Sequence, residues 1–269
     1  MRLTREIRFS VGAGAALPVT NSWAGWPSAA GLQPYVVLRA TVEGRPDPVT
    51  GYLCNIKLID DVLRGRSIPL VNRMAGAEVA ATGDPAAQEV STGERLILAI
   101  AAALAGQAPP GTRWVEWQLN LTPFLSFAVG ADAMSTVRVT QCFEFAAAHR
   151  LHCPSLSDVQ NREIFGKCNN PNGHGHNYQL EVTVSGEPDA RSGVVLPVTQ
   201  VERVVKERII ERFDHKHLNL DCVEFRGLNP SVEHITRVIW ELLEGQFAPA
   251  RLMRVRVWET GKTYAEYEG

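Results

Sequence analysis

The chain has 269 residues, 45% of them hydrophobic, which is enough for one large domain or two ordinary domains with buried cores. With 27 basic and 29 acidic residues the formal net charge is -2, so no electrostatic feature favours nucleic acid or an anionic membrane as a partner. The longest apolar run, Leu96 to Gly106, is too short to span a bilayer. The composition therefore indicates a soluble globular protein with a small-molecule partner.

The N-terminus carries Arg2, Arg5 and Arg8, followed by a run of small residues over 11–17 that faintly resembles a secretory signal peptide. We reject that interpretation, because Phe9 falls where a comparison of the two halves of the chain predicts a first strand. The five cysteines are odd in number and irregularly spaced, so no disulfide framework is expected. Free thiols fit a reducing compartment, and we expect a cytoplasmic protein.

After the strand through Phe9, the first half contains a strand that ends near Gly44 in a Pro-Asp turn, followed by a short strand. Apolar periodicity then predicts two helices, the first of them weakly patterned, and two closing strands. The predicted ranges are 55–64 and 92–105 for the helices and 113–121 and 125–129 for the strands.

A linker is expected between residues 126 and 136, where Gly130-Ala131-Asp132-Ala133 has the composition of a loop. It divides the chain into domains of residues 1–130 and 131–269. The two domains share a motif, because Thr-Val-x-Gly-x-Pro-Asp-x3-Gly begins at Thr41 and again 142 residues later at Thr183. We therefore predict an internal repeat.

The second half repeats the order of elements. Helices are predicted over Val198 to Phe213, with an apolar stripe, and over Ser231 to Gly245, where Pro-Ser suits a helix N-terminus. Strands are predicted over 251–259 and 263–267. Runs of strands around a pair of helices indicate the α+β class, with an antiparallel sheet covered on one face by helices.

All seven histidines lie in the second half of the chain. His174 and His176 are two residues apart, so on a strand both imidazoles project from one face and can share a metal. A catalytic zinc usually takes three protein ligands, and His149, at the end of another strand-like run, is the best third candidate. An H-x-H pair alone is more often a pair of surface histidines, but surface usage would not leave the first half without any.

Four separated motifs lie in a fixed order in the second half: Phe145-x3-His149-Arg150-Leu151, Gly166-Lys167-Cys168-x5-His174-Gly175-His176-Asn177-Tyr178, Phe213-Asp214-His215-Lys216 and Trp258-Glu259-Thr260. In order and spacing they resemble the 6-pyruvoyltetrahydropterin synthase family. The resemblance covers roughly residues 137 to 269.

The resemblance implies the tunnelling fold and one zinc ion held by His149, His174 and His176. With the repeat, we expect two tandem tunnelling-fold domains, each an antiparallel four-stranded sheet with two helices on one face. The first would be degenerate and the second catalytic. When the alignment of the two halves is extended by eye beyond the shared motif, each candidate site residue of the second half falls opposite a residue that is neither a zinc ligand nor an acid. The pairs are Ala13 with His149, Leu32 with His174, Pro34 with His176 and Asn120 with Glu259.

In the resembling enzymes the cysteine at the position of Cys168 is the proton-transferring base. A free cysteine is more often a structural thiol, and a thiol with a pKa of about 8.5 needs a charged or imidazole neighbour to become a thiolate. Asp214 and His215 form a suitable pair, in which the carboxylate orients the imidazole. Because adjacent residues of a strand point to opposite sides, we expect this pair in a loop or at a helix end.

Glu259 lies in a strand of valines and a tryptophan, and a carboxylate there can accept two N-H groups from the amino-pyrimidinone edge of a pterin. The equivalent glutamate of the family anchors the pterin. Glu233 is a less certain substrate-binding residue, since helix capping explains the neighbouring Ser231, and Glu94 falls opposite it in the first half. His152, His217 and His234 are expected to be structural or to support the site.

The resemblance implies conversion of 7,8-dihydroneopterin triphosphate to 6-pyruvoyltetrahydropterin with loss of triphosphate. One alternative is 6-carboxytetrahydropterin synthase of the queuosine route, although those enzymes generally have three residues between the cysteine and the first histidine, where Cys168 and His174 have five. Another is a non-catalytic zinc and pterin binding protein. By resemblance we expect a homotrimer, with the first halves in one ring and the second halves in a stacked second ring.

Overall fold

The computed structural model describes residues 1–12, 25, 26, 28, 33–80 and 92–269, so Ala13 and Leu32 lie outside the described residues. These residues form two compact units, one of Met1–Val139 with Gly186–Val195 and one of Thr140–Ser185 with Leu196–Gly269. The predicted α+β class is confirmed, because antiparallel strands are combined with helices. The predicted domain boundary between residues 130 and 131 rests on the internal repeat in the sequence, and it stays a prediction. No helix in the described part of the chain is long and apolar enough to cross a membrane.

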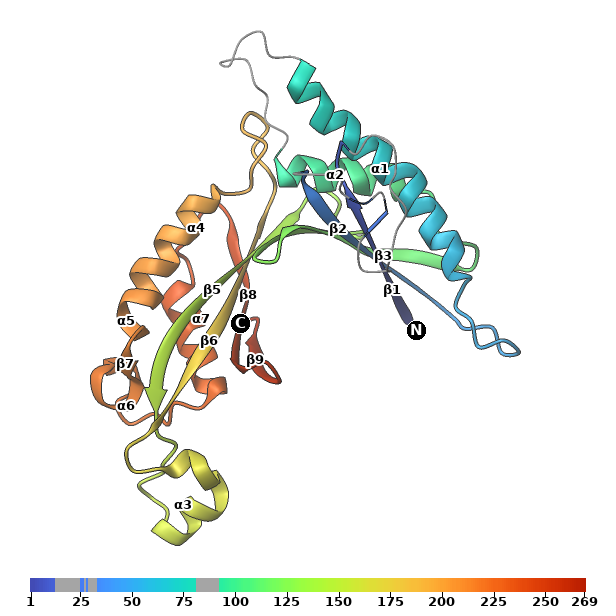
Figure 1. Cartoon of the computed structure of the whole chain (residues 1–269). Helices are drawn as coiled ribbons and strands as arrows, with labels where there is room; N and C mark the ends of the chain where they lie inside the picture. Colours follow the sequence, from blue (N-terminus) through green and yellow to red (C-terminus); the bar gives the residue numbers. More distant parts are fainter. Residues whose placement is uncertain (13–24, 27, 29–32, 81–91) are drawn as a thin grey trace. The chain divides into compact units, whose positions relative to one another are not determined.

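The sheet of the first unit contains β1 (Arg2–Ser10), β2 (Tyr35–Gly44), β3 (Thr112–Thr122) and β4 (Leu125–Gly130), antiparallel and in this order. Alternate residues are buried, among them Phe9, Leu38 and Trp117, as expected for a sheet with one covered face. The helices α1 (Ile56–Ala80) and α2 (Gly93–Leu104) pack against each other and on these strands (Figure 1).

The helix α1 is much longer than the predicted range 55–64, which is therefore wrong at its C-terminal end. Its buried stripe runs through Ile59, Leu63, Ser67 and Val71 at intervals of four residues. A serine inside the stripe, with Pro69 nearby, hides the periodicity from the sequence. The prediction for α2 is confirmed, and Thr92 caps it by accepting the Arg95 N-H.

In the second unit, β6 (His174–Gly186), β8 (Arg251–Thr260) and β9 (Thr263–Tyr267) pair antiparallel, and β5 (Val137–His149) lies beside β6. The two-residue strand β7 (Lys216–His217) pairs in parallel with β5. The helix α7 (Val232–Leu243) packs on β8 and β9 (Figure 1). The buried faces of these strands are rich in valine, so the core lies between the sheet and its helices.

The helical prediction over 198–213 is confirmed, but the segment is α4 (Val198–Val205), a π-helical turn (Lys206–Ile210) and α5 (Glu211–Phe213). Two short helical segments follow β7, α6 (Leu218–Asp221) and a 3-10 turn (Val223–Phe225). The α7 prediction is also confirmed, with Ser231 as its N-cap.

The segment between β5 and β6 was not predicted to be helical. It contains α3 (Asp158–Phe165) and a 3-10 turn (Gly166–Asn169) that carries Cys168, and it lies beyond the ends of the two strands (Figure 1). Asn161 is the one buried residue of α3, so periodicity gives no signal for this helix. The capping box formed by Ser157 and Gln160 could have indicated it.

The predicted short strand after each Pro-Asp is wrong, because both segments are tight loops. The Asp47 carboxylate accepts the N-H groups of Val49 and Thr50, at 3.0 and 2.7 Å. The Asp189 carboxylate accepts the corresponding N-H groups of Arg191 and Ser192, at 3.1 and 2.7 Å. Side chains that bind their own backbone in this way replace strand pairing by a turn.

Gly51 and Gly193 occupy the same place in these two loops, with φ of +71° and +74°. Alanine at Gly51 should cost about 1 kcal/mol, because a side chain disfavours positive φ and its Cβ meets nothing within 4 Å. Alanine at Gly193 should cost about 1 kcal/mol more, because its Cβ would clash with Arg95 Nε and displace a guanidinium that binds the loop. Urea denaturation of both variants measures the difference, and equal losses would contradict this packing.

Candidate active site

Three histidines from two neighbouring strands converge in the second unit. His149 is the last residue of β5, and His174 and His176 lie at the start of β6. His149 Nε2 is 3.0 Å from His174 Nε2, and one nitrogen from each of the three rings lies within 4.8 Å of the others. The three predicted ligands therefore form one group that could hold a metal ion.

The protonation of these rings suits metal binding. His149 is fully buried, and its Nδ1-H donates to the Pro230 carbonyl at 2.7 Å, which leaves the Nε2 lone pair directed at the other two rings. Burial lowers the pKa of His149 to about 4 because it disfavours the imidazolium, and burial also lowers the pKa of His174. Both rings are therefore neutral near pH 7, which is the form that binds metals.

Two buried nitrogens of this group, His174 Nδ1 and His176 Nε2, have no hydrogen-bond partner among the described residues. An unpaired buried polar atom is costly. Three neutral imidazole nitrogens are also the donor set of many catalytic zinc sites. The residues present therefore fit zinc.

Glu259, predicted to bind substrate, lies beside the three histidines. Its Oε1 is 3.4 Å from His149 Nε2 and 3.6 Å from His176 Nε2. The half-buried carboxylate comes from the end of β8, the next strand beyond β6. At this distance it can accept N-H groups from a substrate next to the histidines, or contribute an oxygen ligand to a metal.

Asp214 and His215 follow directly on α5, so the prediction of a helix end is confirmed. Asp214 Oδ1 accepts the Ala146 N-H at 2.8 Å, and the His215 N-H donates to the Ala146 carbonyl at 2.6 Å. His215 has a φ of +58°, and its Nδ1-H donates to Asp214 Oδ2 at 2.8 Å. The Ala146 N-H, with help from His215, holds the pKa of Asp214 below its usual range. An ionised Asp214 thus orients an imidazole that is 83% exposed and can exchange protons through Nε2.

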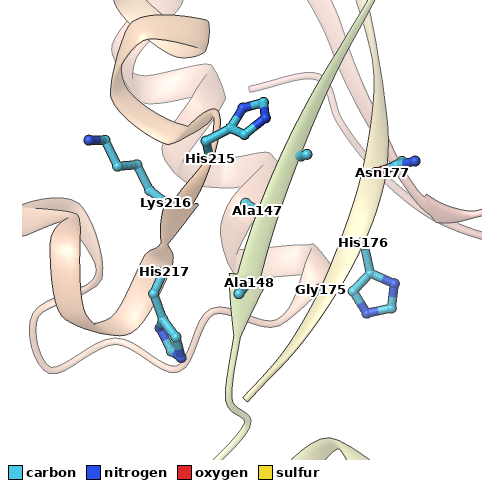
Figure 2. A pocket seen from close by; sticks show the side chains of 9 residues that line it. Ala147, Ala148, Gly175, His176, Asn177, His215, Lys216 and His217 are labelled. Atoms are coloured by element: carbon cyan, nitrogen blue, oxygen red, sulfur yellow. The ribbon is translucent and has the colours of Figure 1, made fainter. Parts of the chain in front are cut away.

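An open pocket of about 660 Å³ adjoins this pair. Figure 2 shows β5 between His215, Lys216 and His217 on one side and His176 on the other. Its lining consists of Ala146, Ala147, Ala148, Gly175, His176, Asn177, His215, Lys216 and His217. A metal-ligand candidate and an acid-base candidate therefore share one pocket.

Cys168 is not among the described residues that line this pocket. It is half-buried, and its backbone carbonyl accepts the Leu151 N-H at 2.9 Å. Asn169 strengthens this link, because its side-chain amide donates to the Leu151 carbonyl at 2.7 Å. The loop that follows His149 therefore fixes the position of Cys168.

Glu233 lies in the first turn of α7 with an exposed side chain. The Ser231 hydroxyl and the Glu233 N-H hold the pKa of its carboxyl below the usual range. These are helix-capping contacts, and the predicted substrate contact of Glu233 stays a prediction.

Sequence reasoning missed the support of His149. His234 Nδ1-H donates to the Asn229 carbonyl at 2.7 Å, and the Asn229 side chain accepts the His152 N-H at 3.1 Å. These bonds fix the backbone at Pro230, whose carbonyl accepts the His149 Nδ1-H. A contact through a backbone carbonyl leaves no signature in the sequence.

His234→Ala should therefore weaken zinc binding by about 10-fold, within the range for partners that orient a metal ligand. His234→Asn is the matched control, because its amide can donate from nearly the position of Nδ1 and should restore affinity. Competition with a chromophoric chelator measures the affinity of both variants. Unchanged affinity in His234→Ala would show that Pro230 is held without this bond.

Comparison with known proteins shows the family of the chain. The family model described as 6-pyruvoyl tetrahydropterin synthase matches residues 138–269. The chain is 37% identical over 140 residues to the 6-pyruvoyl tetrahydrobiopterin synthase of Homo sapiens, an alignment that covers 52% of this chain and 97% of the human protein. The chain belongs to the 6-pyruvoyl tetrahydropterin synthase family.

A second relative in this family is the 6-pyruvoyl tetrahydrobiopterin synthase of Drosophila melanogaster, 43% identical over 126 residues, which cover 46% of this chain and 75% of the fly protein. The solved structure of 6-pyruvoyl tetrahydropterin synthase from Caenorhabditis elegans matches with a TM-score of 0.48 and 36% identity over 50% of this chain and 96% of that chain. The human and fly relatives confirm the family resemblance predicted from the motifs.

Proposed function

We propose that the chain is a zinc enzyme that converts 7,8-dihydroneopterin triphosphate to 6-pyruvoyltetrahydropterin and eliminates triphosphate. The observation that carries the proposal is the group of three histidines with the Glu259 carboxylate beside it, in a chain of the 6-pyruvoyl tetrahydropterin synthase family. The relatives described above are named for this product.

We propose one zinc ion per chain, held by His149, His174 and His176. Bound there, zinc would supply Lewis-acid stabilisation of negative charge that develops on substrate oxygens. The remaining chemistry is proton transfer between carbon atoms and loss of a phosphate leaving group, which needs no nicotinamide or flavin.

The chain's own residues would bind the substrate and move its protons. His215, oriented by Asp214, and Cys168 would remove and return protons on the substrate side chain. Glu259 would accept the N-H groups of the pterin edge and so fix the ring next to the histidines. Because Cys168 and His215 do not line the same described pocket, the two could act from neighbouring chains.

The roles of Glu259 can be separated by Glu259→Gln, which keeps the size of the side chain but offers one N-H donor in place of an acceptor. If Glu259 anchors the pterin, Glu259→Gln should raise KM by about 10-fold or more, because the N-H donors of the pterin lose their charged acceptor. Zinc affinity should be unchanged. Steady-state kinetics with metal titration measure both. A fall in zinc affinity with unchanged KM would make Glu259 a metal ligand instead.

The competing functions are a 6-carboxytetrahydropterin synthase and a non-catalytic zinc and pterin binding protein. One experiment separates all three: the zinc-loaded chain is incubated with dihydroneopterin triphosphate, and the pterin product is identified by mass. We expect 6-pyruvoyltetrahydropterin with equimolar triphosphate. The carboxy product or an unchanged pterin would each refute the proposal.

We also propose that the first unit is a degenerate second copy of the catalytic domain. Support comes from matched details: β2 and β3 change register between Thr41 and Val42, and β6 and β8 change between Thr183 and Val184, at positions 142 residues apart. The Thr4 and Thr41 hydroxyls are 2.8 Å apart, as are those of Thr140 and Thr183.

The strand registers change the residue of the first half that corresponds to Glu259. Asn120 lies opposite Val37, and Trp258 lies opposite Gln179, which is 142 residues after Val37. By this register Leu121, and not the expected Asn120, corresponds to Glu259. Either residue leaves the first unit without the anchoring carboxylate, and we propose a non-catalytic role for it within a cytoplasmic homotrimer.

A further inference from the structure

The two Pro-Asp loops have the same internal bonds but different surroundings. In the loop that follows β6, Gly193 and Val195 are buried, and the segment belongs to the first unit. In the loop that follows β2, Gly51 is exposed, Val49 is 90% exposed and Tyr52 is 66% exposed. One loop therefore has a binding surface, and the described structure leaves the other open.

The binding surface of the buried loop is the N-terminus of α2. The Thr92 hydroxyl donates to the Gly193 carbonyl at 2.7 Å, and the Val195 N-H donates to Glu94 Oε1 at 3.3 Å. The Arg95 guanidinium donates to the Arg191 carbonyl at 3.2 Å. Glu94 is 2% exposed, and burial raises the pKa of its carboxyl. The contact thus buries an acid that needs the loop as a hydrogen-bond donor.

The N-terminus of α7 has the same groups, and no loop of the described residues lies on it. Ser231 is its N-cap, as Thr92 is for α2, and each hydroxyl accepts an N-H from three residues further on. Glu233 follows the cap at the same distance as Glu94. Each carboxylate lies near its own backbone N-H and the capping hydroxyl, but Glu233 is exposed.

We propose that the loop over residues 46–53 of one chain docks on the N-terminus of α7 in a second copy of the chain. The Leu53 N-H would donate to Glu233 and the Ser231 hydroxyl to the Gly51 carbonyl, as Val195 and Thr92 do in the buried contact. The inference rests on the proposed duplication, because that origin makes the buried contact a template for the exposed surfaces.

The exposed side chains favour a protein partner at this surface. Val49 replaces Arg191 and Tyr52 replaces Val194, so the open loop carries more apolar surface than its buried counterpart. The third bond of the template is absent, because His234 stands where Arg95 would be and its Nδ1 is bound to Asn229. The docked loop would therefore depend on two hydrogen bonds and on burial of Val49 and Tyr52.

This contact is heterologous, since a loop of one chain meets a helix of another, so it closes into a ring or continues as a filament. It joins the first unit of one chain to the second unit of the next. It thus favours rings that contain both kinds of unit over the expected separate rings of first and second halves.

A disulfide cross-link tests the contact. Leu53→Cys with Glu233→Cys, in a Cys54→Ser background, should form covalent multimers on mild oxidation, seen by non-reducing electrophoresis. Each single substitution should remain at monomer mass. The matched pair Val195→Cys with Glu94→Cys reproduces the template and should close within one chain, detected by intact mass. Multimers absent from the first pair, while the template pair closes, would overturn the proposal.

Sedimentation supplies a second readout with intact cysteines. Tyr52→Asp places a charge in the proposed contact and should weaken self-association at least 10-fold, whereas Ile164→Asp, an equally exposed apolar position on α3, should not. Equal effects of the two variants would count against the contact. Neither measurement uses zinc or a pterin, so loss of the proposed activity and loss of this contact are observed separately.

Discussion

Cys168→Ala should reduce triphosphate release by about 10³-fold or more while the chain keeps its zinc, because the thiol is proposed to transfer protons and not to bind the metal. The three histidines that would hold zinc do not include this residue. Released triphosphate and bound metal are measured on the same preparation.

Cys153→Ala is the matched control for Cys168→Ala. Cys153 is also a half-buried free cysteine between β5 and β6, and its thiol contacts Ser155. The Cys153→Ala variant should retain full turnover. Near wild-type activity in Cys168→Ala would remove this thiol from the mechanism, and loss of zinc would move it to the metal site.

His149→Ala should lower zinc affinity by more than about 100-fold, since loss of a ligand exceeds the effect of losing an outer partner. Wild-type protein should hold one zinc per chain, because no histidine precedes His149. Elemental analysis after dialysis against a weak chelator gives both results. Two tightly held zinc ions per wild-type chain would show that the first half also binds metal.

Because His149 is fully buried, its replacement could also disturb folding. His176→Ala is a second test, since that side chain is half-buried and lies at the strand start. His152→Ala, which removes a nearby histidine that does not belong to the group of three, should keep its zinc. A circular dichroism spectrum like that of the wild type shows that the variants are folded.

The His174–His176 pair could be predicted from sequence because its geometry is local, whereas His149, on β5, was a candidate third ligand that the family resemblance supported. Two histidines two residues apart share a face of any strand, and β6 begins at the first of them. The approach of Glu259 to within 3.4 Å of His149 could not be predicted, since it depends on the register of β8 beside β6. The family resemblance supplied a role for Glu259, but not its distance from the histidines.

The fold shows the same division between local and long-range information. The predicted starts of α2 at Thr92 and of α7 at Ser231 lie within one residue of the observed starts. The extent of α1 was missed because Ser67 interrupts its apolar stripe, and α3 was missed because it buries almost no side chain. The short strands were wrong because Asp47 and Asp189 bind the backbone that a strand would have used.

The bond from the Ala146 N-H to Asp214 makes one backbone amide a spectroscopic reporter for the proposed acid-base pair of Asp214 and His215. A proton shared with a carboxylate resonates further downfield when the carboxylate is charged than when it is neutral. In a chain labelled with ¹⁵N-alanine, the Ala146 signal would follow the charge of Asp214 and the rotation of His215 without any substrate present. Binding of a pterin, a metal or a neighbouring chain could then be seen at the pair itself, from a residue that takes no part in the chemistry.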